Sequence, residues 1–110
     1  MAKLEWNGGI EVSPAQPQIG DEVQIVYSGL LAGAGADKVF VHVGYGSQNG
    51  WSDVKDYEMI RTNHGWETSL QVYRAGQMNL CFKDRANNWD NNSGHNWSLH
   101  VDPHKFKYAH

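Results

Sequence analysis

The sequence predicts an all-β protein with the fold of an immunoglobulin-like antiparallel β-sandwich. Short runs in which apolar and polar residues alternate recur along the chain, helix signals are weak, and turn-forming residues, among them many of the 12 glycines, separate the runs. A chain of 110 residues is about one domain long. We therefore expect a single sandwich domain, residues 1–110, with about seven strands.

The expected strands show the period-two alternation that turns one face of a strand toward the core. They are residues 22–28, 38–45, 57–63, 66–73, 78–84 and 97–101, with a weaker first strand near residues 10–13. Short connections after residues 63 and 73 favour an antiparallel meander of the third, fourth and fifth of these strands. The small-residue segment LLAGAGAD, residues 30–37, is expected to be a loop. The residues assigned to the core are Val23, Ile25, Tyr27, Val39, Val41, Val43, Trp66, Leu70, Val72, Met78, Leu80, Phe82, Trp97, Leu99 and Val101.

The five tryptophans fall into two classes. Trp66 and Trp97 lie in the apolar register of expected strands, so core packing is the preferred interpretation. Trp6, near the terminus, fits either class. Trp51 and Trp89 lie in polar segments with the composition of loops, GYGSQNGWSD and DRANNWDNNSG. Each of these two either covers an open end of the sandwich or forms part of a binding surface.

An indole ring beside Asn, Asp and Gly suits a pyranose sugar. The axial C–H face of glucose is apolar and stacks on the ring, while side-chain amides donate to and accept from its hydroxyls. Each stacked ring contributes about 2 to 3 kcal/mol before the costs of association, which supports affinities between about micromolar and millimolar. His42, on the outward face of its expected strand, adds a further ring or is a solvated strand residue.

Several segments, in this order, resemble a known family. The stretch VFVHVGYGSQNGW (residues 39–51) precedes Met59, the turn tryptophan of HGW (residues 64–66) and FKDRANNWDNNSGHNW (residues 82–97). Together they resemble carbohydrate-binding module family 25, the starch-binding modules appended to amylases, over most of the chain. The last segment is the most specific part of the resemblance.

The resemblance implies a β-sandwich that binds α-1,4-glucans (starch, glycogen or maltooligosaccharides) without catalysis. It implies that sugar rings stack on His42, Trp51 and Trp89. The residues that it implies as hydrogen-bonding partners of sugar hydroxyls are Asp90, Asn91 and Asn92. The partner would be an α-glucan polysaccharide or oligosaccharide, together with a glucan-active enzyme to which such modules are attached.

An enzyme is a competing interpretation, because a glycosidase needs two carboxyl groups facing each other across a sugar. The loop carboxylates that offer such a pair are Asp53, Asp56, Asp84 and Asp90. A single sandwich of this length leaves little room for a deep cleft, so we predict no catalytic residue. The six histidines show no metal-ligand spacing and DNNSG lacks the further ligands of a calcium loop, so we predict no metal site and no cofactor.

Charge and hydropathy narrow the range of partners. The formal net charge is -3 and the basic residues are scattered, so nucleic acid is not expected, and no apolar window reaches the roughly 20 residues of a membrane span. Cys81 is the one cysteine, which suits the cytoplasm for the chain as it stands, whereas removal of a signal peptide or a parent enzyme would imply an extracellular location. An immunoglobulin-like module for protein–protein interaction, with the tryptophans as interface anchors, is the remaining alternative.

Overall fold

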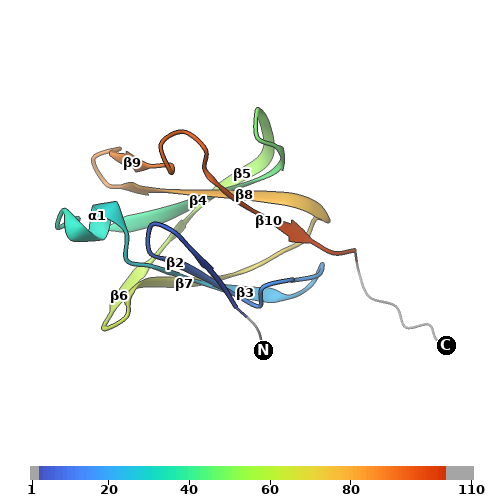
Figure 1. Cartoon of the computed structure of the whole chain (residues 1–110), viewed down its shortest axis with the longest axis horizontal. Helices are drawn as coiled ribbons and strands as arrows, with labels where there is room; N and C mark the ends of the chain where they lie inside the picture. Colours follow the sequence, from blue (N-terminus) through green and yellow to red (C-terminus); the bar gives the residue numbers. More distant parts are fainter. Residues whose placement is uncertain (1–2, 104–110) are drawn as a thin grey trace.

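Two antiparallel sheets pack face to face in the computed structural model, which describes residues 3–103 (Figure 1). The first, called here the β3 sheet, has the order β1 (Leu4–Trp6), β2 (Ile10–Ser13), β3 (Glu22–Tyr27), β7 (Gly65–Gln71) and β6 (Ile60–Thr62). The second, the β4 sheet, has the order β10 (Trp97–Val101), β8 (Gly76–Asp84), β4 (Val39–Ser47) and β5 (Gly50–Glu58), and β9 (Trp89–Asp90) pairs with β8. The predicted sandwich is confirmed.

The core lies between the two sheets, and every residue that the alternation assigned to it is buried. Trp66 and Trp97 are 4% and 5% exposed, which confirms their assignment to the core. The indole Nε1 of Trp97 donates to the carbonyl of Asn7 at 3.1 Å, so this ring also holds the first hairpin against the β4 sheet. Trp6 is half-buried and packs against the edge of the same core.

The meander prediction is wrong for its last strand. β6 and β7 pair as expected, but β8 pairs with β4 and β10 in the other sheet. Packed sheets lie about 10 Å apart, a distance that three or four extended residues can span. The connection 72–75 therefore crosses from one sheet to the other, and its shortness does not distinguish a crossing from a hairpin.

The β5 strand was not predicted, and its C-terminal part was assigned to a strand over residues 57–63. Its burial pattern explains the error: β5 is an edge strand with nearly all its side chains exposed, so it lacks the alternation of a half-buried strand. The chain then moves to the β3 sheet at the buried Met59, whose N–H donates to the carbonyl of Val39 at 3.0 Å. β1 and the short helix α1 (Leu30–Gly33), expected to be part of a loop, were also missed.

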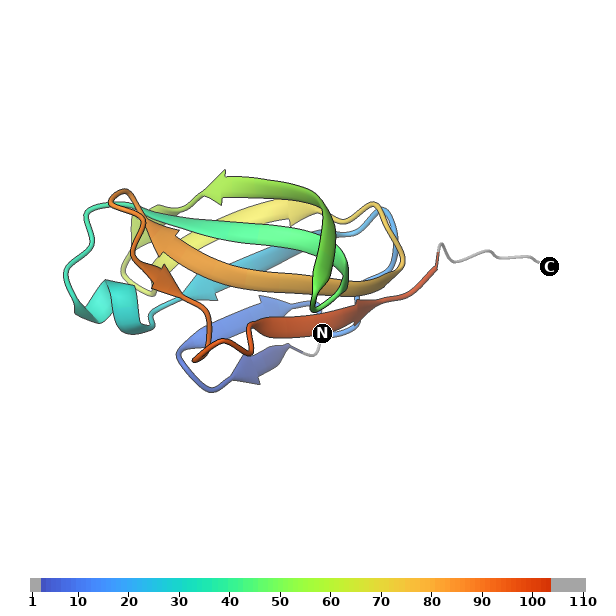
Figure 2. The same cartoon turned by 90° about the horizontal axis from the view of Figure 1, so that it is seen from above.

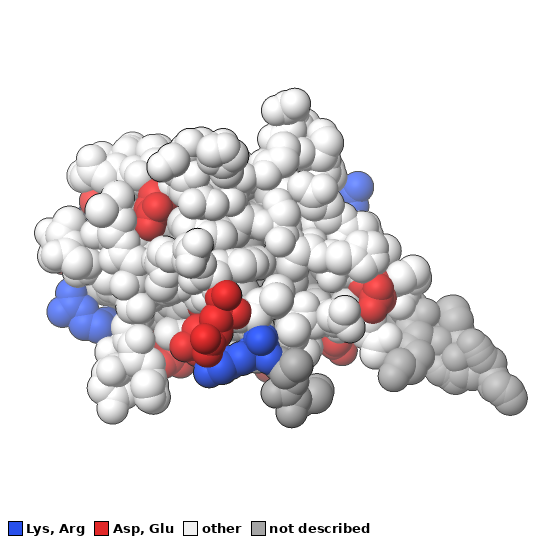
Figure 3. Space-filling model, in the orientation of Figure 1, with Lys and Arg blue, Asp and Glu red and all other residues white. Residues whose placement is uncertain are grey.

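The short helix α1 lies beside β9 at one end of the sandwich, as both views of the ribbon show (Figures 1 and 2). On the face drawn in Figure 3, acidic and basic side chains form small separate groups among uncharged ones. Over residues 3–103, no helix has the length and apolar character needed to cross a membrane.

Candidate functional site

Three aromatic side chains meet on the outer face of the β4 sheet. The ring centroids of His42 and Trp51 are 5.6 Å apart with an interplanar angle of 32°. Those of His42 and Trp89 are 5.1 Å apart, and these two planes are nearly perpendicular at 84°. Trp89 is 44% exposed, and the other two rings are half-buried. We call His42, Trp51 and Trp89 the aromatic site.

His42 faces outward because its neighbours in β4 face inward. Val41 and Val43 are buried in the core, so strand alternation places the imidazole on the opposite face. Cys81 is the partner of His42 in β8 and projects from the same face of the sheet. Burial raises the pKa of the Cys81 thiol to about 12, so the side chain next to His42 is neutral and buried.

Trp51 lies in β5, and the expectation of a loop at this position is wrong. In the first part of the β4–β5 pairing His42 is opposite Asp56, and an uninterrupted register would place Trp51 on the core side. A bulge between Val43 and Tyr45 in this pairing adds one residue to β5, and Trp51 is opposite Gly46 as a result. The added residue brings the indole ring to the face that carries His42.

The bulge is held by a specific contact. Asp53 adopts a left-handed backbone conformation with φ of 52°. Arg74 Nη1, from the connection between β7 and β8, lies 2.7 Å from Asp53 Oδ2 and 2.9 Å from Ser52 Oγ. The guanidinium thus fixes the irregular part of β5 from outside the sheet.

Gly44 makes room for the ring of Trp51. A Cβ atom at Gly44 would lie 2.6 Å from Cε3 of Trp51 and 2.9 Å from its Cβ, closer than non-bonded carbon atoms approach. The indole therefore lies against the bare backbone of β4, next to His42. Its Nε1 donates to the carbonyl of Gln48 at 3.1 Å, which fixes the rotation of the ring.

Trp89 is positioned by the turn that precedes it. The carboxylate of Asp84 accepts hydrogen bonds from the N–H groups of Ala86 and Asn88 and from the amide of Asn88, all at 2.8 to 2.9 Å. These bonds lower the pKa of Asp84 and close the turn, in which Asn87 has φ of 64°. The chain then returns alongside β8 as β9. Trp89 is opposite Lys83 and lies on the outer face of the β4 sheet.

The alternation that turns Trp89 outward turns Asp90 inward. Asp90 pairs with the buried Phe82, is only 9% exposed, and its Oδ2 accepts a hydrogen bond from the hydroxyl of Tyr27 at 2.6 Å. The structure therefore places this carboxylate against the core rather than beside the rings. The polar appearance of NNWDNN suggested a loop, whereas Trp89 and Asp90 form a two-residue strand with opposite faces.

Asn91 and Asn92 stay at the surface in the turn that follows β9. Asn91 Oδ1 accepts from the N–H of Gly94, and Asn92 Nδ2 donates to the carbonyl of Asn96, both at 3.0 Å. Asn96 in turn donates to Oε1 of Gln48 at 3.0 Å, which ties this turn to the hairpin of Trp51. Hydrogen bonding of Asn91 and Asn92 to sugar stays a prediction.

A charged network, which the sequence did not reveal, links the rings. Asp56 Oδ1 lies 2.5 Å from Nδ1 of His42, and its Oδ2 lies 3.0 Å from Nζ of Lys83. Nζ of Lys83 also lies 5.3 Å from the centroid of the Trp89 ring, a cation–π contact. Partial burial raises the pKa of Asp56, but hydrogen bonds from His42 and Lys83 and their positive charges outweigh it, so the net shift is downward.

The four carboxylates considered for catalysis have other partners. Asp53 bonds Arg74, Asp56 bridges His42 and Lys83, Asp84 closes a turn, and Asp90 bonds a buried hydroxyl. Within the described part of the chain, no three His, Cys, Asp or Glu side chains are grouped to hold a metal ion.

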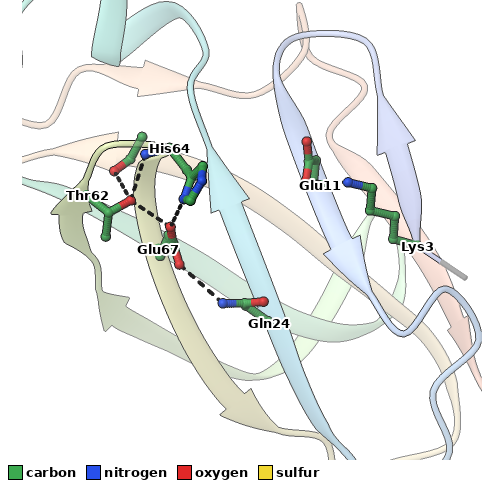
Figure 4. Close-up of polar contacts among 7 residues, drawn as sticks. Lys3, Glu11, Gln24, Thr62, His64 and Glu67 are labelled. Carbon is green, nitrogen blue, oxygen red and sulfur yellow. Dashed lines mark hydrogen bonds and ion pairs between the residues drawn. The ribbon is translucent and has the colours of Figure 1, made fainter. Parts of the chain in front are cut away.

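A hollow of about 580 Å³ lies on the outer face of the β3 sheet, and its lining differs from the aromatic site. Figure 4 shows its polar groups bonded to one another: Glu67 accepts from Thr62 at 2.6 Å and from Gln24 at 3.2 Å. Lys3 and Glu11 form an ion pair at 3.2 Å. The β4 sheet instead presents three clustered rings, which makes it the better candidate for recognising a ligand with an apolar face.

Comparison with known proteins identifies the class of module. The model of the starch/carbohydrate-binding module family 53 matches residues 23–80, more than half of the chain, and this stretch includes His42 and Trp51. An alpha-amylase of Clostridium acetobutylicum is 29% identical over 92 residues, which cover 82% of this chain and 11% of the amylase. The chain thus spans only a small part of that relative's length. No solved structure matches the chain.

The sequence resemblance predicted a starch-binding module of family 25. The starch-binding class is confirmed, and the family that the comparison shows is a different one, family 53. Modules of this kind bind carbohydrate and carry out no reaction on it, in agreement with the absence of a predicted catalytic residue. The chain belongs to the starch/carbohydrate-binding modules of family 53 and is a non-catalytic starch-binding domain.

Proposed function

We propose that the aromatic site is the surface that binds starch, and that it recognises the α-1,4-linked chain. The observation that carries the proposal is the inclination of the rings. Trp51 is tilted by 32° from the imidazole of His42, whereas Trp89 is nearly perpendicular to it. The rings of His42 and Trp51 therefore form one gently inclined surface, and the ring of Trp89 stands nearly perpendicular to His42 at its side.

This shape fits the geometry of the ligand. Successive glucose units in an α-1,4 chain turn relative to one another, so the chain is helical and its apolar faces do not lie in one plane. A β-1,4 chain is an extended, flat ribbon that would be matched by coplanar rings. Both orientations offer an apolar ring face for stacking. Lys83 supplies a hydrogen-bond donor and Asp56 an acceptor next to these rings.

The resemblance to family 25 supports the same residues. In that pattern a strand histidine and two tryptophans stack on the sugar, and these positions are His42, Trp51 and Trp89, which the fold brings together. Asn91 and Asn92, exposed in the turn after Trp89, are the proposed hydrogen-bonding residues for sugar hydroxyls. Asp90 contributes indirectly, by holding the strand that carries Trp89.

We further infer that the domain works in association with a glucan-active enzyme. The support is its similarity to 11% of an alpha-amylase, which is the relation expected of a module within a larger protein. Binding to the polymer would keep such an enzyme close to its substrate and raise the effective concentration of glucan chains.

Titration calorimetry with maltoheptaose, with cellohexaose as the control, tests the proposed specificity. We expect a dissociation constant between about micromolar and millimolar for the α-linked chain and a much weaker one for the β-linked chain. His42→Ala should weaken maltoheptaose binding severalfold. Preference for cellohexaose would contradict the proposal, and indifference to both sugars would favour an interface for protein partners.

A further inference from the structure

A groove adjoins the aromatic site on the far side of Trp89. It has a volume of about 600 Å³, within the usual range of ligand sites. One wall is α1 with the segment after it, and the other is the β8–β9 turn. The lining residues are Leu30, Leu31, Ala34, Gly35, Ala36, Asp37, Asp84, Asn88 and Trp89.

Apolar surface is exposed on both walls of this groove. Leu30 is 67% exposed and Trp89 is 44% exposed, two of the most exposed large apolar side chains of the described residues. Leu30 is the first residue of α1, and nothing in the packing of that short helix requires a large apolar side chain there, because Leu31 supplies its buried contact. The exposed leucine and the indole thus face a common space without being part of the core.

A single buried hydroxyl group fixes both walls. Tyr27 Oη accepts a hydrogen bond from the N–H of Leu31 at 2.9 Å and donates to Asp90 Oδ2 at 2.6 Å. Leu31 belongs to α1 and Asp90 to the strand that carries Trp89, so the two walls are held in a fixed relation. The groove is therefore present before a ligand binds.

Polar groups along the groove suit sugar hydroxyls. An ionised carboxylate has about four acceptor sites, and the three bonds that Asp84 accepts leave one for a ligand. Asp37 lies on the facing wall with its carboxylate 77% exposed and 4.0 Å from Arg85. Two carboxylates facing apolar side chains give the acceptor groups and apolar contact that a glucose unit uses.

We propose that this groove binds the glucose units of an α-1,4-glucan that extend past the aromatic site, with Leu30 and Trp89 in contact with the sugar. The inference rests on the proposed function of the aromatic site and goes beyond it by assigning a further subsite. Its occupant follows from continuity: Trp89 belongs to both surfaces, so a chain bound at the aromatic site has the groove directly in its path. The module then distinguishes glucans by length.

Length-dependent binding of Leu30→Ser provides the test, with Ile60→Ser as the matched control. Ile60 is 68% exposed on β6, in the other sheet, against 67% for Leu30. Calorimetry with maltotriose and maltoheptaose should show tighter binding of the longer sugar by the unaltered protein. Leu30→Ser should weaken maltoheptaose binding by about threefold to tenfold and leave maltotriose binding unchanged. Ile60→Ser should change neither.

Ala34→Gln, which narrows the groove from the helix side, should reproduce the length-specific loss and is independent of the stability of Leu30→Ser. Equal binding of both sugars by the unaltered protein, or unaltered maltoheptaose binding by both variants, would overturn the subsite while leaving the aromatic site intact. A loss of equal size for both sugars would also overturn it, since Leu30 would then belong to the aromatic site. Failure of the unaltered protein to bind either sugar would overturn the proposed function itself.

Discussion

The hydroxyl of Tyr27, in the β3 sheet, donates a hydrogen bond of 2.6 Å to the carboxylate of Asp90, in the β4 sheet. This contact spans the sandwich at β9, the strand that also carries Trp89. Burial and the bond to Asp90 raise the pKa of Tyr27 well above its ordinary value, so the hydroxyl keeps its proton and remains a donor at any physiological pH. The ring of Tyr27 stacks on Phe82 at 4.2 Å, which fixes the direction of the donor.

Tyr27→Phe should therefore lower both stability and affinity. Loss of the hydroxyl leaves a buried carboxylate without its donor, which costs about 1 to 3 kcal/mol of the free energy of unfolding. It also frees β9 and α1, so maltoheptaose binding should weaken severalfold. Urea unfolding and calorimetry measure the two effects. Tyr73→Phe is the control, since Tyr73 is 43% exposed, and a Tyr27→Phe variant as stable as that control would contradict the role of the bond.

Trp89→Ala should separate binding from folding. Because the ring is 44% exposed, its removal should leave the melting temperature nearly unchanged. Loss of about 1.5 to 3 kcal/mol of stacking should weaken maltoheptaose binding by about ten- to a hundredfold in calorimetry. Trp66→Ala is the converse control: it truncates a buried ring and should cost about 3 to 5 kcal/mol of stability. Unfolding of Trp89→Ala would show that this ring supports the fold.

Gly44→Ala should displace Trp51 without disturbing the core. The added methyl group would lie 2.6 Å from the indole, so the half-buried ring of Trp51 has to move. We expect about a tenfold loss of maltoheptaose affinity together with a shift of one indole N–H signal in the NMR spectrum. Gly50→Ala, in the same hairpin, is the control, because its Cβ would meet only Ser47 Oγ at 3.4 Å. An unshifted Trp51 signal in Gly44→Ala would contradict the packing described here.

Asp56→Asn should reveal the contribution of the charged network. The pKa of Asp56 is lowered in the folded protein, so the ionised carboxylate stabilises the fold. This contribution to the free energy of unfolding is complete above the ordinary pKa of about 4 and is lost as the pH falls through the lower folded pKa. Asp56→Asn should weaken maltoheptaose binding severalfold at pH 7. The difference from the unaltered protein should stay constant down to about pH 4 and disappear only as the pH falls through the lower folded pKa of Asp56. Parallel titrations with the two proteins provide this comparison, and a difference that persists at low pH would exclude a role for the charge.

The alternation of side chains predicted most of the core but only part of the site. It placed His42 on the outer face of β4 and Trp97 in the core, and the structure agrees in both cases. Asp90 was misplaced because a strand of two residues leaves no periodic pattern, so the polar stretch looked like a loop. Trp51 was correctly expected away from the core, although in a loop, because a bulge cannot be read from residue types alone.

Lys83 and Asp56 were missed as members of the site for a different reason. Each occupies an ordinary outward position of its strand, and only the register of β8 and β5 against β4 brings both to His42 and Trp89. Register depends on which strands become neighbours. The short connection 72–75 suggested that β8 pairs with β7, whereas β8 pairs with β4. A single sequence therefore indicates which aromatic rings face outward, while the order of strands in the sheet decides which charged side chains lie next to them.

Because the extra residue lies in the edge strand β5, the face that Trp51 occupies can change without a change in the pairing of the buried strands. β5 is an edge strand whose side chains are mostly exposed, so a change of one residue in its length alters which face of the sheet its end presents without shifting the register of β8 and β10 against β4. Removing the bulge would turn the half-buried indole of Trp51 to the opposite face of the sheet and leave a small neighbouring side chain in its place. The same sandwich can thus acquire or lose a ring of the proposed sugar-binding surface through an insertion or deletion at its rim, a far smaller change than rebuilding the core.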